Sequence, residues 1–199
     1  MKPKIEIYLF RVSPTEENRS YILPSEVESH LEKKVGEERL RSQAAYSFLI
    51  GKCRERGILP QFDFSNKPAL KSGFRFSISH TDDCVAVAIG ECEIGVDIEK
   101  KGRQISSRLF KSLSSEERKS CGSDSSLFLK FWVKKEAYLK MIGRGIRLRL
   151  DEVDTTSLKN CHVFEQEGLW IAVCSEESFT ESDVQLRWDP LSERKLKKA

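Results

Sequence analysis

Three strand-like segments follow one another closely in the first half of the chain, and they constrain the fold more than any other feature. Residues 74–79 alternate strictly between apolar and polar side chains, as a half-buried strand does. Residues 84–89 are apolar throughout, which is typical of a buried strand, and residues 94–99 form a third. Residues 80–83 supply a turn, so we expect the second strand to run back along the first.

Helical and strand-like patterns both occur in each half of the chain. Apolar residues recur at helical spacing over 37–56 and 127–142, and glycines follow both segments. Residues 105–113 are expected to be helical, and Ser114 and Glu117 have the spacing of a capping box. Further strands are predicted at 5–12, 162–165, 170–174 and 184–188. Because helices and strands do not alternate regularly, we predict an α+β fold, in which two halves of about 100 residues have similar content.

Composition narrows the class of protein. The 199 residues are 39% hydrophobic, which suffices for a core in one or two compact units. The longest apolar run, around residues 85–89, is far shorter than the ~20 residues that span a bilayer. Residues 1–6 lack the features of a signal peptide, so we expect a cytoplasmic protein. A net charge of +3 is too small to indicate nucleic-acid or membrane binding by itself.

The cysteines are scattered rather than grouped. None of the six forms a CxxC pair, and there are three histidines, so the sequence predicts neither a zinc site nor a disulfide framework. Scattered single thiols fit a reducing compartment best. The cysteines are Cys53, Cys84, Cys92, Cys121, Cys161 and Cys174.

Two acidic residues on the third strand are the sharpest chemical feature. Asp97 and Glu99 are two positions apart, so their side chains leave the same face of the strand about 6.6 Å apart. Carboxylates this close repel each other and are stabilised by a cation between them. A site with oxygen ligands and no His or Cys favours Mg²⁺ over Zn²⁺. The alternative is that both side chains lie on a solvent-facing strand.

The predicted helix over 127–142 carries a second set of charges. Glu136 and Lys140 are one turn apart, so they lie on one face, with Trp132 one turn before them. Glu136 is a candidate third carboxylate for the metal, and Lys140 a candidate phosphate ligand. The alternative is an ordinary ion pair on a helix surface. Lys135 points elsewhere on the helix.

Two shorter motifs offer phosphate ligands. Ser79 and His80 end the first strand and are suited to hold a phosphate oxygen, although a histidine in this position is often a surface residue. Lys67 offers a compact positive charge, and Pro68 rigidifies the chain beside it. Together with the carboxylates, these residues describe a metal-bridged polyphosphate site.

The order of the motifs resembles that of the 4′-phosphopantetheinyl transferases, over residues 41–145. The length resembles the Sfp-like type, which joins two halves in one polypeptide. The motifs are Asn66-Lys67-Pro68, Phe76-Ser77-Ile78-Ser79-His80, Gly95-Val96-Asp97-Ile98-Glu99 and Trp132-Val133-Lys134-Lys135-Glu136-Ala137-Tyr138-Leu139-Lys140.

The resemblance implies a fold and an activity. It implies a pseudo-dimer of two α+β halves, residues 1–92 and 93–199, with the active site at their interface, acting as a monomer. The expected reaction moves the phosphopantetheine arm of coenzyme A to a serine of an apo acyl or peptidyl carrier protein. The reaction is expected to need Mg²⁺ and to release adenosine 3′,5′-bisphosphate.

The resemblance also implies a role for each matching residue. Asp97, Glu99 and Glu136 would hold Mg²⁺. Coenzyme A would be bound by Arg41 at its 3′-phosphate, by Lys67 at the nucleotide, and by Ser79, His80, Asp97, Lys135, Glu136 and Lys140. The residues expected to act in catalysis are Glu136, Lys140 and His80, with Glu136 or a water that it orders as general base.

One departure and two alternatives remain. Ser25 and Glu28 stand where some relatives carry lysines for the 3′-phosphate, and Lys33 and Lys34 are candidate substitutes. A Mg²⁺-dependent phosphohydrolase of coenzyme A or a nucleotide diphosphate would use the same ligand set. A non-catalytic module that binds coenzyme A or a carrier protein is the alternative from another class.

Overall fold

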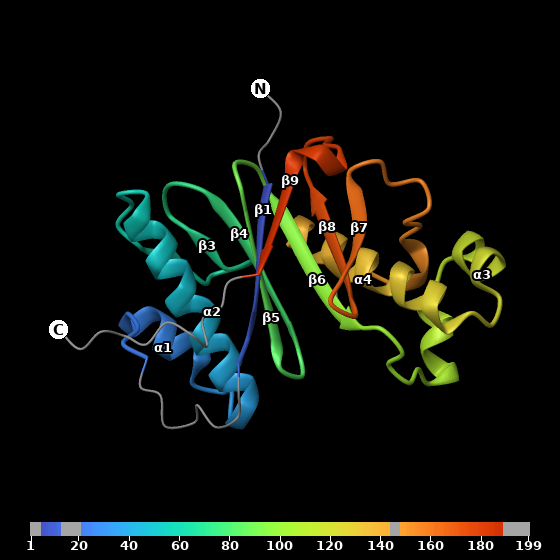
Figure 1. The fold of residues 1–199 in the computed structure, drawn as a ribbon, viewed down its shortest axis with the longest axis horizontal. Coiled ribbons are helices and arrows are strands. Elements are labelled where there is room, and N and C mark those ends of the chain that lie inside the picture. The colour runs from blue at the N-terminus through green and yellow to red at the C-terminus, as the bar shows by residue number, and fades with distance from the viewer. Residues whose placement is uncertain (1–4, 13–20, 144–147, 189–199) are drawn as a thin grey trace.

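Two β-sheets lie side by side at the centre of the molecule (Figure 1). The structure is a computed structural model, and it describes residues 5–12, 21–143 and 148–188. The first sheet has the order β4-β5-β1-β9, and the second has the order β6-β8-β7. The strands are β1 (Ile5–Arg11), β4 (Arg75–Thr81), β5 (Cys84–Gly90), β6 (Ile94–Lys100), β7 (Cys161–Gln166), β8 (Leu169–Ser175) and β9 (Val184–Trp188), with a separate short pair, β2 (Phe62–Asp63) and β3 (Ala69–Leu70).

Helices cover the outer faces of the two sheets. Figure 1 shows α1 and α2 on one side of the molecule, and α3 and α4 on the other. The α-helices are α1 (Ser25–Leu31), α2 (Gly36–Glu55), α3 (Ser115–Cys121) and α4 (Ser125–Ile142), and short 3₁₀ helices are η2 (Ser107–Ser112), η4 (Leu150–Glu152) and η5 (Glu181–Asp183). These elements confirm the α+β class. No helix in the described ranges is long and apolar enough to span a bilayer.

Strand alternation separates the apolar core into clusters. On β1, Tyr8 and Phe10 pack in the cluster with α1 and α2, whereas Ile7 and Leu9 pack against the second sheet. The far face of the second sheet packs on α4 through residues such as Trp170. The order of layers is therefore helix, sheet, sheet, helix, with apolar side chains in each space between them.

The sheets do not separate cleanly at the predicted boundary between residues 92 and 93. Strand β9 comes from the second half of the sequence and pairs in parallel with β1, with Ile5 opposite Val184 and Leu9 opposite Trp188. The division into residues 1–92 and 93–199 stays a prediction, and this strand crosses it.

Most predicted elements are present, with two local differences. Residues 105–113 were expected to be helical, but only a 3₁₀ helix over Ser107–Ser112 forms there. His80 and Thr81 belong to β4 rather than to the turn, which lies at Asp82 and Asp83. The capping box of Ser114 and Glu117 is confirmed: the Glu117 N–H donates to Ser114 Oγ over 3.1 Å, and the Ser114 N–H donates to the Glu117 carboxylate over 2.8 Å.

One expectation about the cysteines is wrong. Cys161 and Cys174 form a disulfide, although the sequence predicted no disulfide. The two residues lie directly opposite each other on the antiparallel strands β7 and β8. Their separation of 13 residues matches no spacing motif, because strand register and not local sequence brings them together.

Candidate active site

A cavity of about 620 Å³ lies between β4, α2 and α4. Its size is within the range of small-molecule sites. It brings together six of the predicted residues, namely Lys67, Ser79, His80, Asp97, Glu136 and Lys140. Arg41, Glu99 and Lys135 do not line it.

A glycine lets α4 approach the acidic strand. Gly95 faces α4 from β6, and a methyl group there would overlap the Ala137 carbonyl oxygen and lie 2.5 Å from the Met141 backbone nitrogen. Alternation then places Asp97 and Glu99 on the same α4-facing side, where they are 7% and 8% exposed. The two carboxylates therefore do not lie on a solvent-facing strand.

Asp97 is held by partners from two elements. Ser79 on β4 donates from Oγ to Asp97 Oδ1 over 2.7 Å, and Lys140 on α4 donates from Nζ to the same oxygen over 2.7 Å. Helix spacing places Lys140 beside Glu136, but Lys140 forms its ion pair with Asp97.

Serine hydroxyls join the edges of the two sheets. The Val96 N–H donates to Ser77 Oγ over 3.0 Å, and the Ile98 N–H donates to Ser79 Oγ over 3.3 Å. These N–H groups lie on the edge of β6 and would otherwise be buried without an acceptor. Ser79 therefore also has a structural role that the sequence did not indicate.

The other two predicted metal ligands, Glu99 and Glu136, both have a raised pKa, and the Asp97 carboxylate contributes to both shifts. Burial raises the pKa of Glu136, the Asp97 carboxylate raises it further, and Lys140 opposes the shift. Burial likewise raises the pKa of Glu99, with Arg103 opposing and Asp97 adding to the shift. Glu99 is ion-paired with Arg103. Within the described part of the chain, no three His, Cys, Asp or Glu side chains are gathered as a metal site.

His80 is surrounded by positive charge. Burial lowers its pKa below the ordinary 6.5, and Lys34, Arg41 and Lys140 lower it further, with Glu38 opposing. The imidazole is therefore neutral at pH 7. Lys34 also lines the cavity. A buried group facing several cations marks a place where an anion would be stabilised.

The Lys67 ammonium joins three parts of the fold. Its Nζ donates to Glu93 Oε2 and to the Ile94 carbonyl oxygen over 2.7 Å each, and to the Met141 carbonyl oxygen over 3.2 Å. Met141 lies in the last turn of α4, where a cation is favourable. Lys67 lines the cavity while its charge is held by the protein.

Arg41 lies beside a second, smaller cavity of about 190 Å³. Its guanidinium donates to Glu37 Oε2 over 3.1 Å and to the Asp82 carbonyl oxygen. Its Nε is buried and finds no hydrogen-bond acceptor among the described residues.

Lys135 corrects an expectation. It was predicted to neutralise the phosphates of the cofactor, but it is fully buried and forms an ion pair with Glu117 of 2.7 Å. Consecutive helix positions differ by about 100° in direction, so Glu136 faces the cavity while Lys135 faces α3.

Several residues around the cavity were not predicted. His30, Tyr46 and Leu148 line it, and the His30 ring stacks on Phe64 with centroids 4.1 Å apart. No spacing motif marks these residues. Gly95, by contrast, could have been found, because a glycine on the same strand face as two carboxylates indicates a close neighbour.

Comparisons with known proteins all match one family. Residues 93–185 match the 4′-phosphopantetheinyl transferase superfamily. The chain is 31% identical to the 4′-phosphopantetheinyl transferase gsp of Aneurinibacillus migulanus over 91 residues, which is 43% of this chain and 38% of that protein. It is 26% identical to a 4′-phosphopantetheinyl transferase of Bacillus subtilis over 134 residues, which is 65% of this chain and 59% of that protein. In each case the chain spans less than two thirds of the relative's length.

Proposed function

Because the chain belongs to the 4′-phosphopantetheinyl transferase superfamily, we propose that it transfers the phosphopantetheine arm of coenzyme A to a serine of an apo acyl or peptidyl carrier protein. The second product is adenosine 3′,5′-bisphosphate. Phosphoryl transfer needs mainly positioning and neutralisation of charge, and the nucleophile here belongs to the partner.

One observation carries this proposal: a single cavity combines carboxylates with several positively charged side chains, which are at present ion-paired within the protein. Asp97 and Glu136 line it together with Lys140 and His80, and the positive charges of Lys34, Arg41 and Lys140 all act on His80. A polyphosphate complements these cations, and the carboxylates complement a metal ion bound to it.

The donor set fits a hard cation. Asp97, Glu99 and Glu136 supply oxygen ligands, and burial with mutual repulsion raises the pKa of both glutamates, so a divalent ion there would stabilise their charged forms. We propose that these three residues hold Mg²⁺, with the side chains of Arg103 and Lys140 giving up their present ion pairs. When bound, Mg²⁺ neutralises the pyrophosphate and polarises its oxygens.

Glu136 is the proposed general base, acting directly or through an ordered water. Glu136 lines the cavity beside Asp97 and Lys140, so it is placed to accept a proton from a hydroxyl group that enters there. Lys140 moves between the Asp97 carboxylate and a phosphate oxygen, and His80, which is neutral at pH 7, donates a hydrogen bond from its ring N–H to the same phosphates.

The 3′-phosphate of coenzyme A is proposed to lie toward Arg41. The nucleotide contact expected of Lys67 stays a prediction, because Lys67 binds at the opposite end of the neighbouring strands β4 and β6. The open Nε of Arg41 is a buried donor that a 3′-phosphate oxygen would satisfy. Lys34 lines the cavity and is the better placed substitute for the lysines that Ser25 and Glu28 replace. Ser79 positions Asp97, and we propose that it also contacts the coenzyme.

The site also supports the proposed internal pairing of two halves. Strand β4 of residues 1–92 and strand β6 of residues 93–199 meet at the cavity through Ser77 and Ser79. We propose that the halves form a pseudo-dimer with the active site between them, and that the protein acts as a monomer.

Product analysis distinguishes this proposal from its two alternatives. Incubation with coenzyme A and Mg²⁺ should yield adenosine 3′,5′-bisphosphate only when an apo carrier protein is present. Free phosphopantetheine formed without carrier would favour the hydrolase. Tight binding of coenzyme A with neither product, tested on several carriers, would favour the binding module.

A further inference from the structure

A buried ion pair lies outside the candidate active site. Glu117 on α3 and Lys135 on α4 are both fully buried, and Lys135 Nζ lies 2.7 Å from Glu117 Oε2. The Glu117 carboxylate also accepts hydrogen bonds from the Ser114 N–H, the Thr155 N–H and the Thr155 hydroxyl, at 2.8, 3.0 and 2.7 Å. Its capacity of about four hydrogen bonds is therefore filled.

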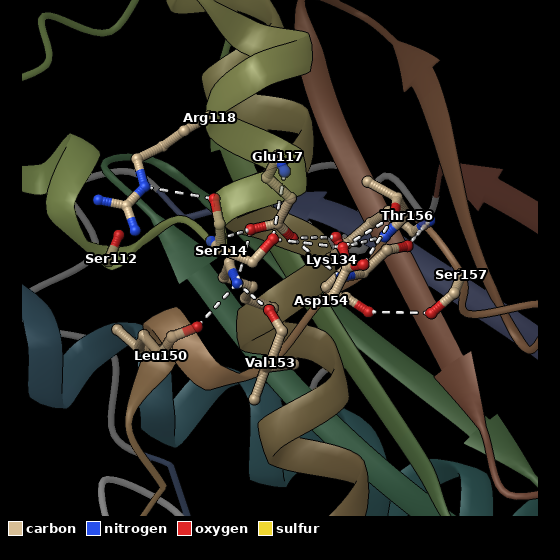
Figure 2. Close-up of polar contacts among 12 residues, drawn as sticks. Ser112, Ser114, Glu117, Arg118, Lys134, Leu150, Val153, Asp154, Thr156 and Ser157 are labelled. Carbon is tan, nitrogen blue, oxygen red and sulfur yellow. Dashed lines mark hydrogen bonds and ion pairs between the residues drawn. The ribbon is translucent and has the colours of Figure 1, made fainter.

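The same pair binds the chain around η4. Lys135 donates to the Leu150 carbonyl oxygen over 2.7 Å and to the Val153 carbonyl oxygen. Lys134 adds a hydrogen bond to the Thr155 carbonyl oxygen over 2.9 Å. Figure 2 shows Glu117, Leu150 and Val153 converging on this network. Residues 150–155 are thus tied to α3 and α4 at both ends.

One end of this segment reaches the cavity. Leu150 and the preceding Leu148 line it, as do Glu136 and Lys140. Leu150 therefore lines the cavity while its carbonyl oxygen is held by Lys135. On α4, Lys135 and Glu136 are neighbours that face the anchored segment and the cavity, respectively.

A buried charge pair often stabilises a fold no more than apolar side chains of similar size would, because desolvation offsets most of the attraction between the charges. What an ammonium group offers here is direction: it fixes two carbonyl oxygens and one carboxylate at once. An apolar side chain of the same size would fill the space without fixing the backbone.

We propose that Lys135 and Glu117 are positioning residues that hold residues 150–155, and with them the Leu148–Leu150 wall, in the geometry that binds the ligand of the cavity. The identity of that ligand as coenzyme A rests on the proposed function. The positioning itself does not.

The test separates positioning from stability. Lys135→Met and Glu117→Gln each leave one buried charge without its partner, and each should lower the melting temperature by roughly 10 °C. The double variant Glu117→Gln/Lys135→Met removes both charges, so it should melt above either single variant. It still lacks the two hydrogen bonds to Leu150 and Val153.

Two measurements test whether residues 150–155 and the cavity beside them keep their geometry. Hydrogen exchange of the backbone amides of residues 150–155 should be about tenfold faster in the double variant, with residues 169–175 unchanged as internal reference. The Kd for coenzyme A, measured by calorimetry, should rise about tenfold. The control variant Glu116→Gln/Lys119→Met makes the same charge changes in an exposed pair on α3, and it should match the parent protein in both readouts.

Two results would overturn the proposal. One is native exchange of residues 150–155 in the double variant, since the pair would then not hold the segment. The other is faster exchange with unchanged affinity, since the segment would then not shape the binding site. If the parent protein bound no coenzyme A, the proposed function would fail, and the exchange comparison would still decide whether the pair holds the segment.

Discussion

Lys140 on α4 donates a hydrogen bond to Asp97 on β6, with Nζ 2.7 Å from Oδ1. Asp97 and Lys140 both line the cavity, and Ser79 binds the same carboxylate oxygen. The pair lies where the two sheets and α4 meet, and it depends on the close approach of α4 at Gly95. In the proposed reaction the two side chains separate, one toward Mg²⁺ and the other toward a phosphate.

Neutralising Asp97 should therefore affect the reaction more than the fold. Asp97→Asn keeps an acceptor for Ser79 and removes the charge that attracts a cation. We expect transfer to slow by about a hundredfold or more, with a melting temperature close to that of the parent. Turnover and thermal unfolding, measured on the same preparation, check this. Normal turnover of Asp97→Asn would exclude Asp97 as a metal ligand.

His80 should report the positive charge in the cavity. Its pKa in the folded protein lies below the ordinary 6.5, so between these two pH values the unfolded chain binds more protons. The free energy of unfolding should therefore decrease as pH falls below 6.5, and His80→Gln should reduce this loss. A polyanion that neutralises Lys34, Arg41 and Lys140 should raise the pKa of His80.

NMR titration of the imidazole with and without coenzyme A measures this shift. His30 also has a lowered pKa, so the His80→Gln spectrum is needed for assignment. A His80 pKa that coenzyme A leaves unchanged would place the phosphates elsewhere.

Gly95 should tolerate no side chain. The methyl group of Gly95→Ala would overlap the backbone of α4, which must shift, and we expect a loss of about 3 kcal/mol in the free energy of unfolding. Gly51→Ala is the matched control, because Gly51 lies in α2 with open space around it. That change should be neutral or stabilising. Denaturant unfolding of both variants checks the pair, and equal stabilities would contradict the close approach.

The disulfide between Cys161 and Cys174 can be counted chemically. Of the six cysteines, Cys53, Cys84, Cys92 and Cys121 are free. Alkylation of the denatured protein without reductant should label those four, and prior reduction should expose all six. Reduction should also lower the free energy of unfolding by about 3 kcal/mol. Six labels without reductant would show that the two thiols remain reduced.

Local patterns predicted the elements but not all of their neighbours. The alternation over residues 74–79 and the apolar run over 84–89 correspond to the paired strands β4 and β5. Strand β9 was also predicted, yet nothing in its five residues indicates a parallel partner at the other end of the chain. The disulfide escaped prediction for the same reason, since it depends on the register of β7 and β8.

In the candidate site, too, local geometry was predictable, whereas contacts between separate elements were not. Alternation correctly placed Asp97 and Glu99 on one face, because that follows from strand geometry alone. The burial of Lys135 could not be predicted, because charged residues are usually exposed and its partner Glu117 comes from another helix. Lys140 was paired with Glu136 by helix spacing, whereas the approach of α4 to β6 brings it to Asp97.

The central claim is tested most directly by the intact mass of an apo acyl carrier protein incubated with this protein, coenzyme A and Mg²⁺. We predict a gain of one phosphopantetheine arm, which is lost when EDTA is added or when Asp97→Ala replaces the parent. An unchanged carrier mass, in the presence of coenzyme A that is tightly bound to the protein, would contradict the claim.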